Sequence, residues 1–454
     1  MNLARMLAER AAENNPIRVG LIGAGKFGTM FLAQLRRTKG MHLVAIADLA
    51  PARARAALLS CGWEAERATA DSFADAVRTG KTFLTEDAAA LLASAQIDVV
   101  VEATGDPAAG IRHCLGAIAG GKHIVMVNVE ADVLAGPLLA QRARAAGVIY
   151  SLAYGDQPAL ICEHVDWARA CGFEVVSAGK GTRYHPNFHQ STPDTVWDCF
   201  GLTQEKAARG GMNPKMFNSF IDGSKSGIEM TAVCNATGLT PQPHGLSFPP
   251  ATCNDLARIC KPRERGGVLA HKGTVEVVSS LNRDMTPVPH HLQMGTYVVV
   301  EAGHEYVRHC AEEYNMLPDE TFEHIALYRP THMIGLEIGI SVATIALRGE
   351  PTGAPDGFRA DVVATAKRTL LAGEVLDGEG GYCVWGKQMP AAQSLAEGCL
   401  PLGLAHRVTL KHTIAEGASI RWSDVEIDAD DPAVRVRREM EAAFARPNAE
   451  ARAR

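Results

Sequence analysis

Three closely spaced glycines near the N-terminus constrain the fold of this chain more than any other feature. Residues 17–22 are mostly apolar and β-branched, which predicts a strand, and residues 27–38 predict a helix. Gly23 permits a tight turn, Gly25 lets a ligand approach the main chain, and Gly28 allows close packing of the helix. The helix N-terminus favours anions. The segment therefore predicts the pyrophosphate site of a Rossmann-type dinucleotide-binding domain.

An acidic residue follows at the end of the next predicted strand. Residues 42–47 form this strand, and Asp48 ends it, twenty residues after Gly28. A carboxylate at this place accepts hydrogen bonds from the adenosine ribose and favours NAD over NADP. Arg53 and Arg55 follow, and either could reach a 2′-phosphate, although arginines at a helix start are more often only solvated. The choice of cofactor stays open on these residues alone.

Strands and helices continue to alternate after Asp48, which predicts a parallel sheet with helices on both faces. The predicted strands cover residues 97–102, 123–129 and 148–153, and the predicted helices cover residues 111–120 and 133–146. The residues predicted to contact the cofactor are Gly23, Gly25, Lys26, Phe27, Gly28, Asp48, Arg53, Ala103, Thr104, Gly105 and Asn128.

The pattern changes after this alternation, and the whole chain predicts an α/β protein of several domains. The fold class is a Rossmann-type doubly wound parallel sheet, an inserted α+β substrate domain and a small β-rich C-terminal domain. A run of turn-forming residues at 349–357 marks a linker. The predicted domains are residues 1–153 with an N-terminal helix, 154–354 for substrate binding and dimerisation, 355–430, and a polar tail at 431–454 that frays from residue 448.

Composition and charge exclude several classes of protein. The net charge of −6 without a dense Lys/Arg cluster argues against nucleic acid or an anionic membrane as partner. A small-molecule partner fits better. Residues 1–16 lack the continuous apolar core of a signal peptide, and the eleven cysteines are scattered without a C-x-x-C pair. We therefore expect a cytoplasmic protein with reduced thiols.

The middle of the chain contains cationic residues in glycine-rich surroundings. Lys180 and Arg183 lie in an extended segment, and Lys225 lies in the sequence Asp-Gly-Ser-Lys-Ser-Gly, whose hydroxyls and amides suit a phosphate. These three residues are candidate substrate contacts. The alternative is that they are ordinary solvated surface residues.

Asp222 and Glu229 are candidate catalytic residues near Lys225. Together with Glu130 they could hold magnesium or manganese, because hard cations prefer carboxylate oxygens. The alternative is a helix-capping Asp222 and an ion-paired Glu229.

Several segments resemble homoserine dehydrogenases and related reductases. They are Val125-Met-Val-Asn-Val-Glu130, Tyr154-Gly-Asp-Gln-Pro158 and Ser226-Gly-Ile-Glu-Met-Thr-Ala-Val-Cys-Asn235. The first segment is similar to the place where a strand ends in an Asn-Lys pair in that family. This chain has Val129 and Glu130 where the lysine is expected. The departure argues against homoserine as the substrate.

The whole chain resembles the 1-deoxy-D-xylulose 5-phosphate reductoisomerase-like proteins. Besides the glycine turn and residues 154–158, the matching segments are residues 179–186, 222–229 and 372–382. The resemblance implies NADPH-dependent conversion of 1-deoxy-D-xylulose 5-phosphate to 2-C-methyl-D-erythritol 4-phosphate, for isoprenoid precursor synthesis, with a divalent cation (Mg or Mn). It also implies a homodimer and an SAF-like C-terminal domain.

Two other functions stay open at this point. The chain could be a dehydrogenase of another sugar phosphate or hydroxy acid, in which Lys180 or Lys225 assists hydride transfer without rearrangement. It could instead be a nucleotide-sensing or assembly protein whose C-terminal module binds a partner. Identification of the product separates the first alternative, and cofactor oxidation separates the second.

Overall fold

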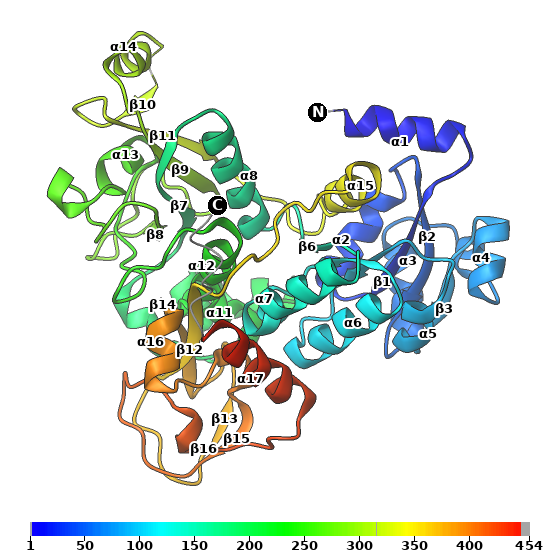
Figure 1. Cartoon of the computed structure of the whole chain (residues 1–454). Helices are drawn as coiled ribbons and strands as arrows, with labels where there is room; N and C mark the ends of the chain where they lie inside the picture. The colour runs from blue at the N-terminus through cyan, green and yellow to red at the C-terminus, as the bar shows by residue number, and fades with distance from the viewer. Residues whose placement is uncertain (1, 315, 446–454) are drawn as a thin grey trace. The chain divides into compact units, whose positions relative to one another are not determined.

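The computed structural model describes residues 2–314 and 316–445 (Figure 1). Two compact units divide the chain. The first unit comprises Met1–Leu160 and Met333–Asp356, and the second comprises Ile161–His332 and Gly357–Arg454. The boundaries expected after residues 153, 354 and 430 stay predictions. Among the described residues, no helix is both long enough and apolar enough to span a bilayer.

The first unit is built on a six-stranded parallel sheet of order β3-β2-β1-β4-β5-β6. The apolar strands are almost fully buried at the centre of the sheet, as expected when helices cover both faces. This confirms the Rossmann-type α/β fold predicted from the alternation. The strands are β1 Ile17–Ile22, β2 Met41–Ala47, β3 Phe83–Thr85, β4 Val99–Glu102, β5 His123–Met126 and β6 Tyr150–Leu152.

Helices pack on both faces of this sheet. One face is covered by α2, α3 and α15, which share a buried core with β1, β2 and β4, and the other by α5, α6 and α7 (Figure 1). The helices are α1 Leu3–Ala12, α2 Lys26–Leu35, α3 Pro51–Ser60, α4 Phe73–Thr79, α5 Ala88–Ala93, α6 Pro107–Ala119, α7 Val129–Ala145, α8 Gln157–Ala170, which continues into the second unit, and α15 Gly339–Arg348.

Three features of the first unit differ from the sequence-based expectation. The short strand β3 was not predicted, because three residues carry too little periodicity. The strand expected over residues 123–129 ends at Met126, because Asn128 caps α7 by accepting a hydrogen bond from the Ala131 amide at 3.1 Å. In addition, Ile338 and Val342 bury α15 in the core of this unit, although the sequence placed them with the middle block.

The second unit contains a mixed five-stranded sheet of order β10-β11-β9-β7-β8. Met230, Val233 and Cys234 of α12 pack on one face against β8 and β9, and α13 covers the other. The strands are β7 Glu174–Thr182, β8 Thr274–Ser279, β9 Thr296–Glu301, β10 Leu317–Pro318 and β11 His324–Arg329, and the helices are α9 Val196–Phe200, α10 Gln204–Arg209, α11 Pro214–Ile221, α12 Ser224–Thr237, α13 Leu256–Ile259 and α14 Glu305–Glu313.

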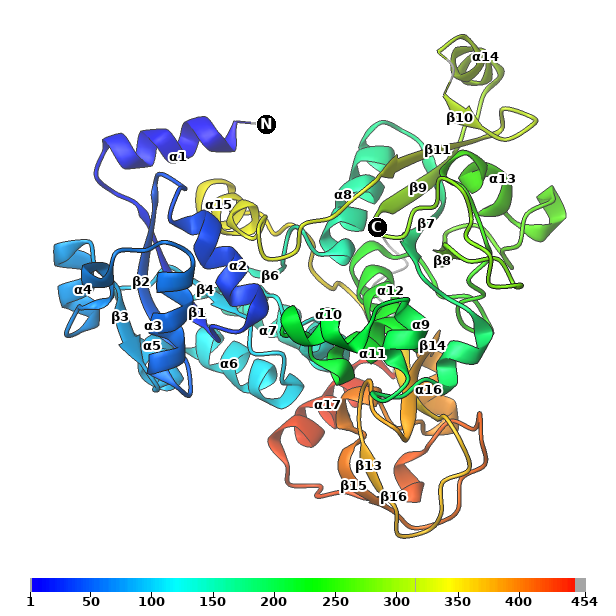
Figure 2. The ribbon, with the colours of Figure 1, turned by 180° about the vertical axis from the view of Figure 1, so that it is seen from behind.

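A β-rich module completes the second unit and packs on α12 (Figure 2). The helix α17 is tied to β12 by the fully buried ion pair between Arg437 and Asp361, 2.6 Å apart. The elements are β12 Ala360–Ala366, β13 Val375–Asp377, β14 Val384–Pro390, β15 His406–Leu410, β16 Val425–Glu426, α16 Ala391–Glu397 and α17 Pro432–Phe444. The SAF-like identity of this module stays a prediction, and the fraying expected at residues 448–454 lies outside the described residues.

Candidate cofactor and substrate sites

The glycine turn between β1 and α2 is tight at two glycines and open at the third. Gly23 has φ +92°, and a Cβ atom on it would lie 2.8 Å from the Ala103 carbonyl oxygen. A Cβ atom on Gly28 would lie 2.2 Å from the Gly23 carbonyl oxygen, whereas one on Gly25 would meet nothing within 4 Å. Gly25 also begins α2 without a side-chain cap. The turn therefore leaves space for a pyrophosphate at the N-terminus of α2.

Asp48 lies beside this turn at the end of β2. Its carboxylate accepts hydrogen bonds from the amides of Ala24 and Ala50, each at 2.9 Å, and from the Arg53 guanidinium at 2.7 Å. Burial acts to raise the pKa of Asp48, but these hydrogen bonds and the charge of Arg53 hold it below its ordinary value. Arg55 instead donates to the Ala68 carbonyl at 2.8 Å. Of the two candidate arginines, Arg53 is thus the one at the acidic strand end.

The predicted contacts after β4 gather at the same edge of the sheet. Ala103 pairs with Ile22 of β1 through a backbone hydrogen bond of 2.8 Å, and Gly105 has open space around it at φ +73°. The Thr104 hydroxyl donates to Glu102 at 2.5 Å, and the Asn128 amide donates to the Asp106 carbonyl at 2.8 Å. Lys26 and Phe27, in the first turn of α2, complete the set. The structure thus brings the predicted cofactor residues of β1, β4 and β5 together.

Buried polar residues that the sequence did not indicate lie behind this edge. Asp132 of α7 is fully buried and accepts a hydrogen bond of 2.7 Å from the Tyr150 hydroxyl. Desolvation raises the pKa of Asp132 to about 7. Glu102 is also fully buried and lies 3.1 Å from the His113 ring. Sequence reasoning missed these residues because neither the helix pattern around Asp132 nor the strand pattern around Glu102 marks a carboxylate as fully buried.

Replacing Asp132 with asparagine is expected to flatten the pH dependence of folding stability. The unfolded carboxyl titrates near its ordinary pKa of about 3.9, whereas the folded one keeps its proton to about pH 7. The wild-type contribution is therefore fully present below about pH 4 and is lost as the pH rises to about 7, an effect on the order of 4 kcal/mol at 1.36 kcal/mol per pKa unit. Urea unfolding of both proteins at several pH values across this interval measures it, and equal slopes would contradict the assignment.

In the second unit, β7 and α12 place Lys180 against Glu229. The ammonium and the carboxylate form a hydrogen-bonded ion pair, and the two side chains are only 7% and 6% exposed. Lys180 lies near the end of β7, and Glu229 lies in the second turn of α12. Two residues that the sequence proposed separately are therefore direct partners.

Asp222 has a different lysine as its partner. It ends α11, and one carboxylate oxygen accepts a hydrogen bond of 2.9 Å from the Ser224 amide. The other oxygen lies 2.7 Å from Nζ of Lys367, which also donates to the carbonyls of Ser191 and Gly381, each at 2.7 Å. Lys367 belongs to the β-rich module, and no sequence pattern connected it with Asp222.

Lys225 and Arg183 lie in the same unit on other elements. Lys225 is in the first turn of α12, next to Ser226, whose buried hydroxyl has no hydrogen-bond partner among the described residues. Arg183 donates from Nε to the Cys199 carbonyl of α9 at 2.8 Å.

Tyr184 and His189 form a chain of hydrogen bonds that ends at the backbone carbonyl of Asp222. His189 Nδ1 lies 2.7 Å from the Asp222 carbonyl oxygen, and its Nε2 lies 2.9 Å from the Tyr184 hydroxyl. The carbonyl can only accept, so Nδ1 carries the proton and Nε2 accepts from Tyr184. Burial lowers the pKa of His189, which favours the neutral ring. The sequence did not predict this chain, although Tyr184 lies in the segment that contains Lys180.

The carboxylates proposed as metal ligands do not fit a divalent cation in this arrangement. Glu229 is engaged by Lys180 and Asp222 by Lys367, so each already faces an ammonium group. Glu130 lies in α7 of the other unit. Among residues 2–314 and 316–445, no three His, Cys, Asp or Glu side chains come close enough to hold a metal ion.

Two family models match consecutive parts of the chain. Residues 23–152 match the NAD-binding domain of homoserine dehydrogenase, and residues 155–338 match the catalytic domain of the oxidoreductase DRL family. No curated protein sequence is significantly similar to the chain.

Solved structures are similar to part of the chain. A homoserine dehydrogenase from Thiobacillus denitrificans is 23% identical with a TM-score of 0.35, over 49% of this chain and 49% of that one. A myo-inositol dehydrogenase from Lactobacillus casei, in complex with NAD(H) and myo-inositol, is 18% identical with a TM-score of 0.28, over 40% and 52%. An NAD-binding oxidoreductase from Klebsiella pneumoniae is 22% identical with a TM-score of 0.27, over 37% and 43%. The chain thus spans about half of these proteins.

The family matches agree with the geometry of the glycine turn and of Asp48. An NAD-binding domain of the homoserine dehydrogenase type precedes an oxidoreductase catalytic domain along the chain. Both matched parts are thus similar to domains of NAD(P)-dependent oxidoreductases.

Proposed function

We propose that this oxidoreductase converts 1-deoxy-D-xylulose 5-phosphate to 2-C-methyl-D-erythritol 4-phosphate with NADPH. The resemblance of the whole chain supports the substrate, and the match of residues 155–338 supports an oxidoreductase reaction in this block. The observation that carries the proposal is the hydroxyl of Ser226, which is buried at the start of α12 without a partner among the described residues. Such a hydroxyl is costly unless a ligand atom completes its hydrogen bonding.

The start of α12 has the properties of a phosphate site. The helix has 14 residues; its N-cap residue Gly223 has no side chain to cap it, and Asp222 accepts the Ser224 amide just before the first turn. Its dipole favours an anion at this end. Ser226 would donate a hydrogen bond from its hydroxyl to a phosphate oxygen, and Lys225 would supply positive charge from the same turn. Arg183 is assigned as a further contact to the phosphate. This arrangement selects a phosphorylated substrate over a neutral sugar.

The pair of Lys180 and Glu229 is assigned to the reacting end of the substrate. NADPH supplies a hydride, and a proton is added to the carbonyl oxygen, so the cofactor is oxidised and the rearranged sugar phosphate is reduced to an alcohol. Lys180 would donate a hydrogen bond to that oxygen as negative charge develops on it. Glu229 would hold the ammonium group in place through the ion pair.

The proposal includes no step through a metal, although the resemblance implies a divalent cation. Asp222 forms an ion pair with Lys367, and Glu229 forms one with Lys180. Neither carboxylate is therefore available to a divalent cation. Full turnover in excess chelator is the result expected from this arrangement. Loss of turnover in chelator, restored by magnesium, would show that the lysine pairs open when substrate binds.

The test of the proposed function is one assay with product identification. Purified protein is incubated with NADPH and 1-deoxy-D-xylulose 5-phosphate, with and without magnesium, and the product is identified by mass and NMR. The proposal expects 2-C-methyl-D-erythritol 4-phosphate. A reduced product with an unrearranged skeleton would make the enzyme a simple dehydrogenase. Tight NADPH binding without oxidation by any sugar phosphate would favour a sensor. The homodimer implied by the resemblance stays a prediction for sedimentation analysis.

Replacing Arg53 with alanine is expected to raise KM for NADPH by about tenfold while changing KM for NADH much less. Arg53 is 60% exposed at the acidic strand end, 2.7 Å from Asp48, where a 2′-phosphate would lie. The loss of one charge-assisted contact is worth about 1.4 kcal/mol or more, which is a factor of ten. Arg55→Ala is the matched control, because Arg55 is committed to the Ala68 carbonyl. Equal changes for both cofactors would remove Arg53 as a phosphate contact.

A further inference from the structure

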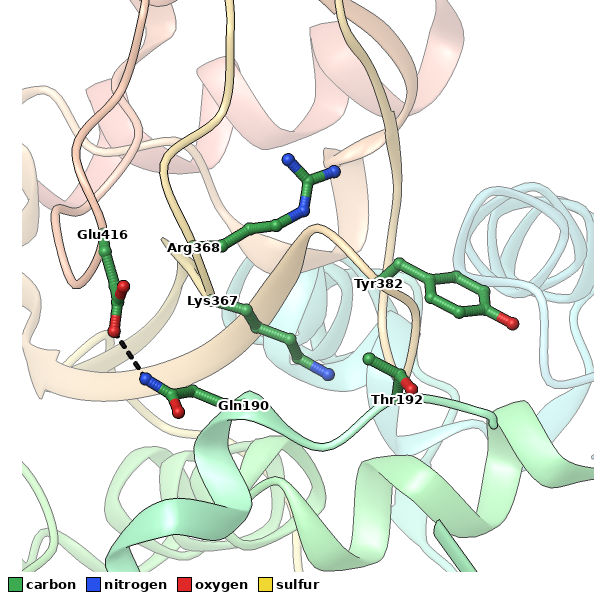
Figure 3. Close-up of a pocket in the computed structure, with 6 residues that line it drawn as sticks. All are labelled: Gln190, Thr192, Lys367, Arg368, Tyr382 and Glu416. Carbon is green, nitrogen blue, oxygen red and sulfur yellow. Dashed lines mark hydrogen bonds between the residues drawn. The ribbon is translucent and has the colours of Figure 1, made fainter. Parts of the chain in front are cut away.

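The β-rich module and the segment after β7 line an open pocket of about 570 Å³ in the second unit (Figure 3). This volume lies within the range of small-molecule sites, about 300–1,000 Å³. None of the residues proposed from the sequence as catalytic lines it. All its lining residues are polar or amphipathic: Gln190, Thr192, Lys367, Arg368, Tyr382 and Glu416.

Arg368 is the cation that can bind a ligand in this pocket. The side chain is half exposed. Its Nη1 donates to the Thr369 carbonyl at 3.1 Å and to Glu374 at 3.3 Å, and its Nη2 donates to Glu374 at 2.8 Å. A guanidinium has five N–H donors, so Nε–H and one Nη2–H have no acceptor among the described residues. Carboxylates and phosphates are recognised by paired donors of this kind.

Lys367 has a different part in the same pocket. Its ammonium group has three donors, and these face the carbonyls of Ser191 and Gly381 and the carboxylate of Asp222, each at 2.7 Å. Lys367 therefore forms the floor of the pocket and joins it to Asp222. It is not the residue that holds a ligand.

Hydrogen-bond acceptors lie across the pocket from Arg368. The side-chain amide of Gln190 donates to one carboxylate oxygen of Glu416 at 2.5 Å (Figure 3). The second Glu416 oxygen and the side-chain carbonyl oxygen of Gln190 remain as acceptors. The Tyr382 hydroxyl donates to Asp194 at 3.0 Å and can still accept, and the Thr192 hydroxyl adds another polar group. Glu416 repels a second anion and attracts hydroxyl donors. The lining thus suits a ligand with one acidic group and several hydroxyls.

We infer that this pocket is a binding site for a small hydroxylated acid, a polyol that carries a single carboxylate or phosphate. Arg368 binds the acid group through its two remaining N–H donors. Glu416, Gln190, Thr192 and Tyr382 bind the hydroxyls. The inference does not depend on the proposed reductoisomerase reaction, because binding is measured without turnover and without cofactor.

Calorimetric titration of the full chain with two acids and two neutral polyols tests this inference. D-Gluconate carries a carboxylate and glycerol 3-phosphate a phosphate, and sorbitol and glycerol are their neutral counterparts. We expect at least one acid to bind with one site per chain, and the neutral polyols to bind at least tenfold more weakly. Binding of gluconate alone or of glycerol 3-phosphate alone identifies the acid group. Absence of binding by both acids at millimolar concentration would overturn the inference.

Variants of Arg368 assign the site to this pocket. Arg368→Gln is expected to weaken acid binding at least tenfold, and Arg368→Lys to give an intermediate affinity, because it keeps the charge and loses the paired donors. Arg435→Gln, at an exposed arginine of α17 in the same unit, is the matched control and should bind as the wild type does. Thermal unfolding establishes that each variant is folded. Unchanged acid binding in folded Arg368→Gln would place the acid elsewhere and overturn the assignment.

Discussion

Replacing Lys180 with methionine is expected to abolish turnover and to lower the free energy of unfolding by about 3–5 kcal/mol, the cost of leaving a buried charge without its partner. Glu229 is almost fully buried and has Lys180 as its ion-pair partner. Methionine keeps the length and the apolar stem of lysine but removes the charge and the donors. Steady-state assays of NADPH oxidation measure turnover, and urea unfolding measures the free energy of unfolding.

A double variant separates the role in turnover from the role in folding. Lys180→Met with Glu229→Leu replaces both charges by apolar groups, which often leaves stability near or above the wild-type value. We expect it to recover most of the lost stability and none of the turnover. Lys272→Met is the matched control: Lys272 precedes β8, is 49% exposed and bridges Glu174 of β7 and Glu301 of β9, and its loss should cost about 1 kcal/mol or less. Wild-type turnover in either Lys180 variant would contradict the assignment of the pair to the reaction.

Replacing Gly25 with alanine is expected to weaken NADPH binding about 100-fold, or about 2.7 kcal/mol, without changing the melting temperature. A Cβ atom at Gly25 meets no protein atom within 4 Å, and the backbone there, at φ −74°, suits any residue. The methyl group would instead occupy the space through which the pyrophosphate approaches the main chain. Fluorescence titration with NADPH and thermal unfolding measure the two quantities.

The same substitution at two other glycines provides the controls. Gly28→Ala should lose both stability and cofactor binding, because its Cβ would lie 2.2 Å from the Gly23 carbonyl oxygen and would force α2 away from β1. Gly339→Ala should change neither, since its nearest neighbour, Met41, lies at an ordinary 3.9 Å. If Gly25→Ala binds NADPH as tightly as the wild type, the pyrophosphate does not lie at this turn.

The sequence predicted the first unit well because its signals are local. A β-branched strand, a turn that only glycine can form at Gly23, and a helix that begins at the turn are specified by neighbouring residues. The acidic strand end at Asp48 and the alternation of strands and helices identify the parallel sheet in the same way. One error was a short-range competition, the cap at Asn128 that ends β5 early and starts α7, whereas the packing of α15 in this core is a long-range contact.

The pairings in the second unit were not predictable in this way. The sequence indicated Lys180 and Glu229 as separate candidates, but their pairing depends on how α12 lies on the sheet that contains β7. Lys367 reaches Asp222 only because the β-rich module packs on α12. Contacts between residues far apart in the chain leave no periodicity or spacing to detect.

The sequence by itself determined the Rossmann-type sheet and the glycine turn, because chirality, backbone freedom and hydrophobic period act between neighbours. The tertiary structure alone decided that Asp222 and Glu229 are neutralised by lysines and that Asp132 is buried deeply enough to raise its pKa to about 7. It also decided that the β-rich module holds the start of α12, where Gly386 donates to Ser224 at 2.8 Å. Charge pairing and desolvation depend on distance and burial in three dimensions, which packing sets.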